Sequence, residues 1–164
     1  MLNKHFPEEI NNILDIITND HERSSSALEF VVILESVKYL DFVNVHSETT
    51  FGDVIKKLEL MGLPNYLIRE FKDYKRKRNG ICHNSKIFMA QFNDKDYYKE
   101  YSLLAANLVH LTVEYVDNNY INFEHVERKY FRYLESKGRP IPENEKKYYM
   151  KKASKLSRSH IFTK

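Results

Sequence analysis

The chain has 164 residues, of which 42% are hydrophobic and 30% charged, with a formal net charge of +3, a composition that favours one globular domain. Its longest apolar run, residues 30–34, is too short for a membrane span, and its single cysteine excludes an internal disulfide and a cysteine-based zinc site. With no apolar signal-peptide core at the N-terminus, the sequence predicts a cytoplasmic protein without a membrane partner.

Two helices are predicted in the first quarter of the chain. Pro7 suits a first helical turn, and the apolar residues that follow it at helical spacing are Ile10, Ile13, Leu14 and Ile17. Ser26 and Glu29 form a capping-box pattern, which predicts an apolar helix through about Phe42. The run 30–34 alone also fits a buried strand, but the cap and the continued apolar spacing favour a helix.

The next two helices are separated by a stop signal. Residues 50–53 predict a helix start, and Gly62 is expected to end that helix, with Pro64 just beyond. Pro64 opens another helix, whose apolar face carries Leu67, Phe71 and Tyr74.

The second half of the chain predicts three more helices. Asn93 can cap the first, whose apolar stripe is Tyr97, Tyr101, Leu104, Leu108, Leu111 and Tyr115. A second helix covers about 123–136 and ends at Gly138, and a basic one runs from about 143 to 157. No segment alternates with period two. The sequence therefore predicts an all-α bundle of four to five core helices in residues 1–138, with a basic helical extension in residues 139–164.

Positive charge is concentrated at two places. Residues 139–164 hold eight Lys and Arg against two Glu, a net of +6, so residues 1–138 carry −3. A second basic cluster, opposed locally only by Asp73, consists of Lys72, Lys75, Arg76, Lys77 and Arg78. A phosphate-bearing partner needs such concentrations of charge, although a charge run is also typical of a solvated helix face.

Arg78 occupies an unusual position on its helix. It follows Tyr74 by four residues and precedes Ile81 by three, so it falls on the apolar seam of the helix after Pro64. A guanidinium there needs a partner or a cleft, because burying an unpaired charge is costly. One interpretation is a structural arginine paired with Glu29 or Glu35, both of which lie in an apolar helix.

The residues around Arg78 suggest a second interpretation. Asn79 follows Arg78 directly, and His83 stands five residues after it. In an all-helical chain this pattern resembles the HEPN superfamily, whose signature is an arginine followed by a polar residue and a histidine four to six positions on. The resemblance covers about residues 7–120, and the basic tail lies outside it.

The resemblance implies a metal-independent endoribonuclease that needs no cofactor and acts as a toxin or phage-defence effector. In such an enzyme, the ribose 2′-hydroxyl attacks the adjacent phosphate. His83 would move protons, Arg78 would stabilise negative charge on the phosphate, and Asn79 would orient either group. The remaining RNA-binding candidates are Lys72, Lys75, Arg76, Lys77 and Asn84.

The spacing of the motif leaves its geometry open. Residues five apart on a helix lie about 140° apart, so Arg78 and His83 do not share a face. A helix distortion at Gly80, a long reach by Arg78, or a homodimer with a composite site would each bring the two groups together. HEPN domains typically pair with two-fold symmetry. An antitoxin or defence-complex partner is also implied, but Ser85 stands where the modified tyrosine of one HEPN toxin class is found.

Two alternatives to an enzyme stay open. One is a non-catalytic HEPN-like module that binds nucleic acid, a nucleotide or a protein partner, in which Arg78 and His83 stabilise the bundle. The other is a basic helical nucleic-acid-binding protein, whose affinity depends steeply on salt and survives the removal of His83.

Overall fold

A computed structural model describes residues 3–19, 26–46, 48–83 and 95–163, without the side chains of residues 26, 82–83, 95–98 and 158–163. The described residues form α-helices joined by short turns and contain no strand, which confirms the all-α prediction. The helices are α1 (Glu8–Asn19), α2 (Ser26–Ser36), α3 (Phe51–Leu60), α4 (Asn65–His83), α6 (Lys95–Asn118), α7 (Phe123–Ser136) and α8 (Glu143–Thr163).

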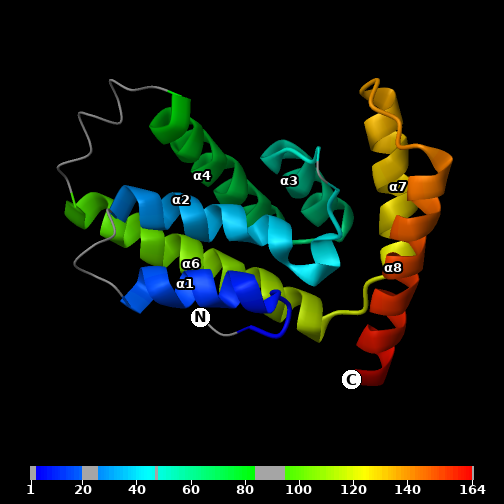
Figure 1. Ribbon diagram of the computed structural model, residues 1–164, viewed down its shortest axis with the longest axis horizontal. Coiled ribbons are helices and arrows are strands. Elements are labelled where there is room, and N and C mark those ends of the chain that lie inside the picture. Colours follow the sequence, from blue (N-terminus) through cyan, green and yellow to red (C-terminus); the bar gives the residue numbers. More distant parts are fainter. Residues whose placement is uncertain (1–2, 20–25, 47, 84–94, 164) are drawn as a thin grey trace.

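The helices form a bundle with a hairpin at one end. Helices α1, α2 and α6 run side by side, and α2 packs chiefly against α6 (Figure 1). The short α3 lies between α4 and α7 and contacts both. Helices α7 and α8 pack against each other at that end of the bundle, with their axes across those of α1, α2 and α6.

Helix α2 is shorter than the sequence predicts. It ends at Ser36, and two 3-10 turns follow at Val37–Tyr39 and Asp41–Val43. Leu40 between them is extended, with φ −62° and ψ 132°, and this conformation ends the helical path. The turns bury Val37 and Phe42 without continuing the helix. Apolar spacing alone therefore did not distinguish an α-helix from consecutive tight turns.

Helix α3 begins and ends at the predicted residues. Thr50 and Asp53 form a capping box, in which each side chain accepts a hydrogen bond from the other residue's backbone N–H. At the other end Gly62 has φ +91°, while its N–H bonds to Glu59 and that of Leu63 bonds to Leu58. These two bonds form a Schellman motif, in which a residue of positive φ is usually glycine.

The buried face of α6 matches the predicted stripe only in part, because Leu108 is buried and Tyr101, Leu111 and Tyr115 pack against the core, but Leu104 does not. Leu104, expected in the apolar stripe, is 41% exposed, whereas Ser102, Ala105 and Thr112 are buried. Small residues on the buried face allow α6 to approach α2 closely. The Thr112 hydroxyl is satisfied by donating to the Leu108 carbonyl at 2.8 Å. The buried positions of α6 therefore include small residues, while the larger Leu104 stays partly exposed.

The C-terminal extension is anchored to the bundle. The predicted boundary at residue 138 falls in the turn between α7 and α8, where Gly138 has φ +74°. Arg139 of this turn donates two hydrogen bonds of 2.8 Å to Asp53 at the start of α3. Burial opposes the charge on Asp53, but these bonds hold its pKa below the usual value. On α8, Ala153 is fully buried in the main core.

His5 ties the N-terminal segment to two distant carboxylates. Its Nδ1 lies 2.9 Å from Asp41 and its Nε2 lies 2.8 Å from Asp117 at the end of α6. Burial lowers the pKa of His5, but the bonds to these carboxylates outweigh burial and raise it above 6.5 overall. The folded state therefore favours the protonated imidazolium, which can donate to both carboxylates at once.

We expect the stabilisation by His5 to depend on pH. The pKa of His5 is higher in the folded state than in the unfolded chain, where it is about 6.5. Its contribution to the unfolding free energy is therefore fully present below pH 6.5, and it is lost as the pH rises through the folded-state pKa. The unfolding free energies of the wild type and His5→Gln should differ more at about pH 6 than at about pH 9. A His5→Gln difference that grows with pH would contradict the assignment.

Candidate functional site

Helix α4 carries the Arg-Asn-x3-His segment without a break. It is α-helical from Asn65 to His83, including Gly80, so a distortion at Gly80 does not bring Arg78 toward His83. By helical register, positions 78 and 83 lie about 140° apart on this helix, and positions 79 and 83 share a face. Of the three routes to a complete site, a long reach by Arg78 and a second subunit remain.

Arg78 continues the buried seam of α4, as predicted. Leu67 and Phe71 on the preceding turns are buried, and the Arg78 side chain is 17% exposed. Its Nε lies 3.3 Å from a Glu35 carboxylate oxygen of α2, and its guanidinium carbon lies 5.6 Å from the centre of the Phe51 ring. Of the two acids that the sequence suggested as partners, Glu35 is the one in contact with Arg78.

The pairing of Arg78 with Glu35 is incomplete. The Nε of Arg78 is buried and has no hydrogen bond of good geometry among the described residues. Glu35 is also shared, because Lys38 approaches its other carboxylate oxygen at 3.5 Å. A guanidinium offers five donors in a planar fork, so Arg78 keeps donors that can bind an anionic oxygen.

The other basic residues of α4 point in different directions. Lys72 is exposed, and Arg76 is 76% exposed with a 2.6 Å bond to Asp73 one turn earlier. Lys77 lies over the Tyr101 ring of α6, with its Nζ 3.9 Å from the ring centre. Lys75 extends over the start of α3, where its Nζ lies within 3.0 Å of the point that a Cβ on Gly52 would occupy. The cluster therefore surrounds the helix, and within it Lys72 and Arg76 are exposed, Arg76 while paired with Asp73.

By helical register, four polar positions of α4 fall along one stripe. Lys72, Arg76, Asn79 and His83 follow one another at spacings of four, three and four. Such spacings keep residues on one face of a helix. The arginine that shares a face with positions 79 and 83 is therefore Arg76, while Arg78 faces α2 and α3. Asn84 and the side chain of His83 lie outside the described residues, so their contacts stay untested.

Gly80 offers a test of how open this part of α4 is. Among the residues that the structure describes, a Cβ at Gly80 meets nothing within 4 Å, and φ is not positive there. Glycine within a helix costs up to about 1 kcal/mol relative to alanine. Gly80→Ala is therefore expected to raise the unfolding free energy of the isolated chain by about 0.5–1 kcal/mol in urea titrations. A lower unfolding free energy would contradict this expectation.

The sequence analysis missed a buried ion pair between α3 and α7. The Lys57 ammonium lies 2.8 Å from one Glu127 oxygen and donates at 3.0 Å to the other, and also at 3.0 Å to the Asn44 carbonyl. It lies 4.6 Å from the centre of the Tyr130 ring. Burial lowers the pKa of Lys57 and raises that of Glu127, and the contact between the two groups opposes both shifts without cancelling them.

A signal for this pair was present in the sequence. Lys57 follows Val54 by three residues and precedes Met61 by four, which places it on the apolar face of α3. Its partner Glu127 is 70 residues away, and no local pattern links the two.

Comparison of the chain with known protein families, with curated proteins and with solved structures gives no match. Within the ranges that the structure describes, no helix is both long and apolar enough to cross a bilayer.

Proposed function

We propose that this chain is a metal-independent endoribonuclease of the HEPN type, acting as a toxin or phage-defence effector. The observation that carries the proposal is the placement of Arg78. It is a half-buried guanidinium with spare donors, on a continuous basic helix that ends at His83. This residue combination suits cleavage of a phosphodiester next to a ribose hydroxyl.

The proposed reaction needs a base, an acid and fixed positive charge. The base removes the proton of the 2′-hydroxyl, and the 2′-oxygen bonds to phosphorus as the bond from phosphorus to the 5′-oxygen breaks. The acid gives a proton to the departing 5′-oxygen, which leaves a 2′,3′-cyclic phosphate and a 5′-hydroxyl. An imidazole, which His83 would supply, ordinarily titrates in the range that both proton transfers require. Arg78 stabilises the charge on the phosphate, Asn79 orients it, and the exposed Lys72 and Arg76 bind the RNA.

A homodimer would complete the site. The unbroken helix leaves Arg78 and position 83 on different faces, which favours a composite site with the histidine of a second copy. Two-fold pairing is the commonest oligomer, and it would supply one histidine as acid and one as base. Sedimentation of the purified protein should show a dimer, and cleavage should depend on its concentration across the dissociation range.

The experiment that tests the proposal is RNA cleavage in the presence of EDTA. Purified protein should cut single-stranded RNA with EDTA present and leave ends that are resistant to a phosphatase until the cyclic phosphate is opened. A strict requirement for added metal, or the absence of cleavage with a panel of RNAs, would contradict it.

The Arg78–Glu35 contact favours a second candidate, a non-catalytic binding module. If Arg78 acts only by pairing with Glu35, Arg78→Ala and Glu35→Gln should each lower stability, and the double variant should lose less than the sum of the two. If Arg78 is catalytic, Arg78→Ala should abolish cleavage with a change in unfolding free energy under about 1 kcal/mol. Thermal melts and cleavage assays on the same three variants distinguish these candidates.

A further inference from the structure

A second feature of the molecule lies away from the Arg-Asn-x3-His segment. An open cavity of about 560 Å³ is lined by three parts of the chain, namely the segment before α1, the two 3-10 turns after α2 with the residues that follow them, and the middle of α8. This volume is in the range of about 300–1,000 Å³ that small-molecule sites occupy. The basic α8, which lies outside the HEPN resemblance, therefore contributes one wall of a pocket.

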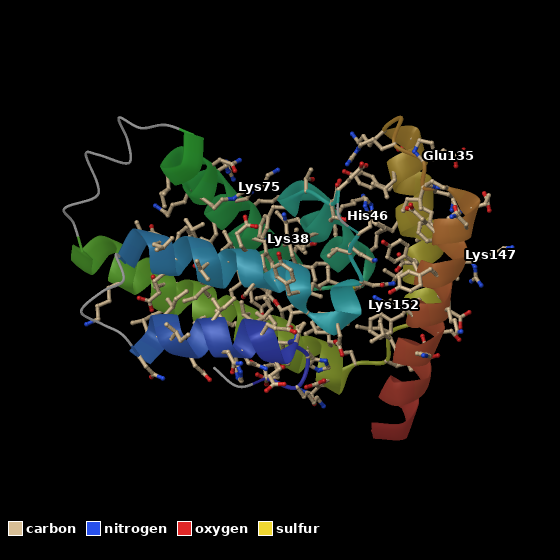
Figure 2. The ribbon with its side chains drawn as sticks, viewed as in Figure 1. Lys38, His46, Lys75, Glu135, Lys147 and Lys152 are labelled. Carbon is tan, nitrogen blue, oxygen red and sulfur yellow. The ribbon has the colours of Figure 1, made fainter. Side chains whose placement is uncertain are left out.

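The polar groups of this cavity are mostly cationic. Four lysines from the three segments line it, and these are Lys4, Lys38, Lys152 and Lys155. Figure 2 shows Lys152 on the side of α8 that faces the bundle, and Lys147 on the opposite side. The acid in the lining, Asp41, is already engaged by His5 at 2.9 Å. The cavity therefore presents excess positive charge to a ligand.

The lysines are only loosely paired. Lys38 lies 3.5 Å from Glu35, and Lys4 lies 3.7 Å from Asp117, distances longer than a charge-assisted hydrogen bond. The Nζ of Lys152 lies 4.8 Å from the centre of the Tyr148 ring. Exposed pairs of this kind contribute less than about 1 kcal/mol, so a ligand can displace them at small cost.

Apart from Asn44, the remaining lining of the cavity is apolar. It is made by Phe6, Pro7, Tyr39, Leu40, Val45 and Leu156. An inorganic anion would leave this surface unused, and an apolar molecule would leave the lysines unused. A ligand that uses both has an apolar or aromatic body and a strongly anionic end. A phosphate monoester carries about −1.5 to −2 charges near pH 7, and lysine is a common phosphate-binding residue.

We propose that this cavity binds a small organic phosphate, with its apolar or aromatic body against Phe6 and Leu156 and its phosphate between the lysines of α8 and Lys38. The volume of about 560 Å³ and the apolar part of the lining favour a small organic molecule over an RNA strand, because single-stranded nucleic acid is usually held in a charged groove that follows its backbone over several nucleotides. The site does not use Arg78 or His83, so it stands independently of the proposed nuclease activity.

The test is calorimetric titration of the full chain with phenyl phosphate, AMP and inorganic phosphate at low salt. We expect phenyl phosphate or AMP to bind at least about tenfold more tightly than inorganic phosphate, because only the organic ligands contact the apolar wall. The double variant Lys152→Glu/Lys155→Glu should weaken organic phosphate binding by about tenfold or more. The matched control, Lys147→Glu/Lys151→Glu, makes the same charge change on exposed positions of α8 outside the cavity. It should change the affinity by less than about threefold.

Several results would overturn the proposal. Equal losses in the two double variants would indicate general surface charge, and equal affinity for inorganic and organic phosphate would indicate that the apolar wall contributes nothing. Loss of RNA affinity in Lys152→Glu/Lys155→Glu without organic phosphate binding to the wild type would assign the lysines to RNA. Lys38→Met changes a lysine on a different segment and should also weaken organic phosphate binding. It replaces the double variant as the test if the double variant does not fold. His83→Ala should bind organic phosphate as the wild type does. The phosphate site can therefore be tested even if the nuclease proposal fails.

Discussion

Replacing His83 by alanine is expected to lower the rate of RNA cleavage by a factor of about 10²–10⁴, the usual contribution of a group that transfers protons. In the proposed site, His83 supplies both the base for the 2′-hydroxyl and, through a second copy, the acid for the 5′-oxygen. Loss of the imidazole therefore removes two proton transfers in a symmetric dimer. The measurement is the single-turnover rate on a labelled single-stranded RNA with EDTA present.

The controls for this prediction are a second histidine and a second substitution. His110→Ala changes a histidine on α6 whose side chain is 73% exposed, and it should leave the rate unchanged. His83→Gln keeps a polar side chain but cannot titrate near neutrality, so it should lose as much activity as His83→Ala. Thermal melts of each variant should match that of the wild type. Cleavage that persists in His83→Ala would contradict the mechanism.

Lys57→Met is expected to lower the unfolding free energy by about 3–5 kcal/mol, because it leaves the Glu127 carboxylate buried without its cation. The lysine side chain is 2% exposed and that of Glu127 3%, so water cannot replace the lost partner. Of the described contacts to that carboxylate, the hydrogen bond from Asn44 at 3.2 Å would remain. Urea unfolding followed by circular dichroism measures the change.

Two further variants test whether the loss comes from the buried charge. Lys56→Met removes the neighbouring lysine, which is paired loosely with Glu59 at 3.8 Å on the surface, and should cost less than about 0.5 kcal/mol. The double variant Lys57→Met/Glu127→Leu removes both charges together and should recover more than half of the stability lost by Lys57→Met. If the double variant is as unstable as Lys57→Met or less stable, the loss does not come from the unpaired Glu127 charge.

The buried pair also explains how α7 and α8 are held to the bundle. Asn44, which follows the second 3-10 turn with φ 53°, donates both to Glu127 of α7 and to the Tyr149 carbonyl of α8. Together with the Arg139–Asp53 pair, this network joins the hairpin to α3 by polar contacts in addition to apolar ones. Destabilising Lys57 should therefore also disturb the cavity wall that α8 provides. Variants of Lys57 are unsuitable for testing that cavity.

The sequence by itself was sufficient to predict the features that depend on neighbouring residues. The helical class, the helix start at residues 50–53, the stop at Gly62 and the limits of α7 all follow from patterns spanning a few residues. The same holds for the position of Arg78 on a buried seam, since helical spacing relates it to Phe71 and Tyr74.

Only the tertiary structure decided which distant groups meet. It selected Glu35 over Glu29 as the contact of Arg78, paired Lys57 with Glu127, and brought Lys38 and Lys152 to one cavity. It also ended α2 at Ser36. On α6 it buried Ser102, Ala105 and Thr112 and left Leu104 partly exposed. These outcomes depend on how whole helices pack. Close packing and the pairing of buried charges involve residues far apart in the sequence, and no local spacing pattern predicts which of them meet.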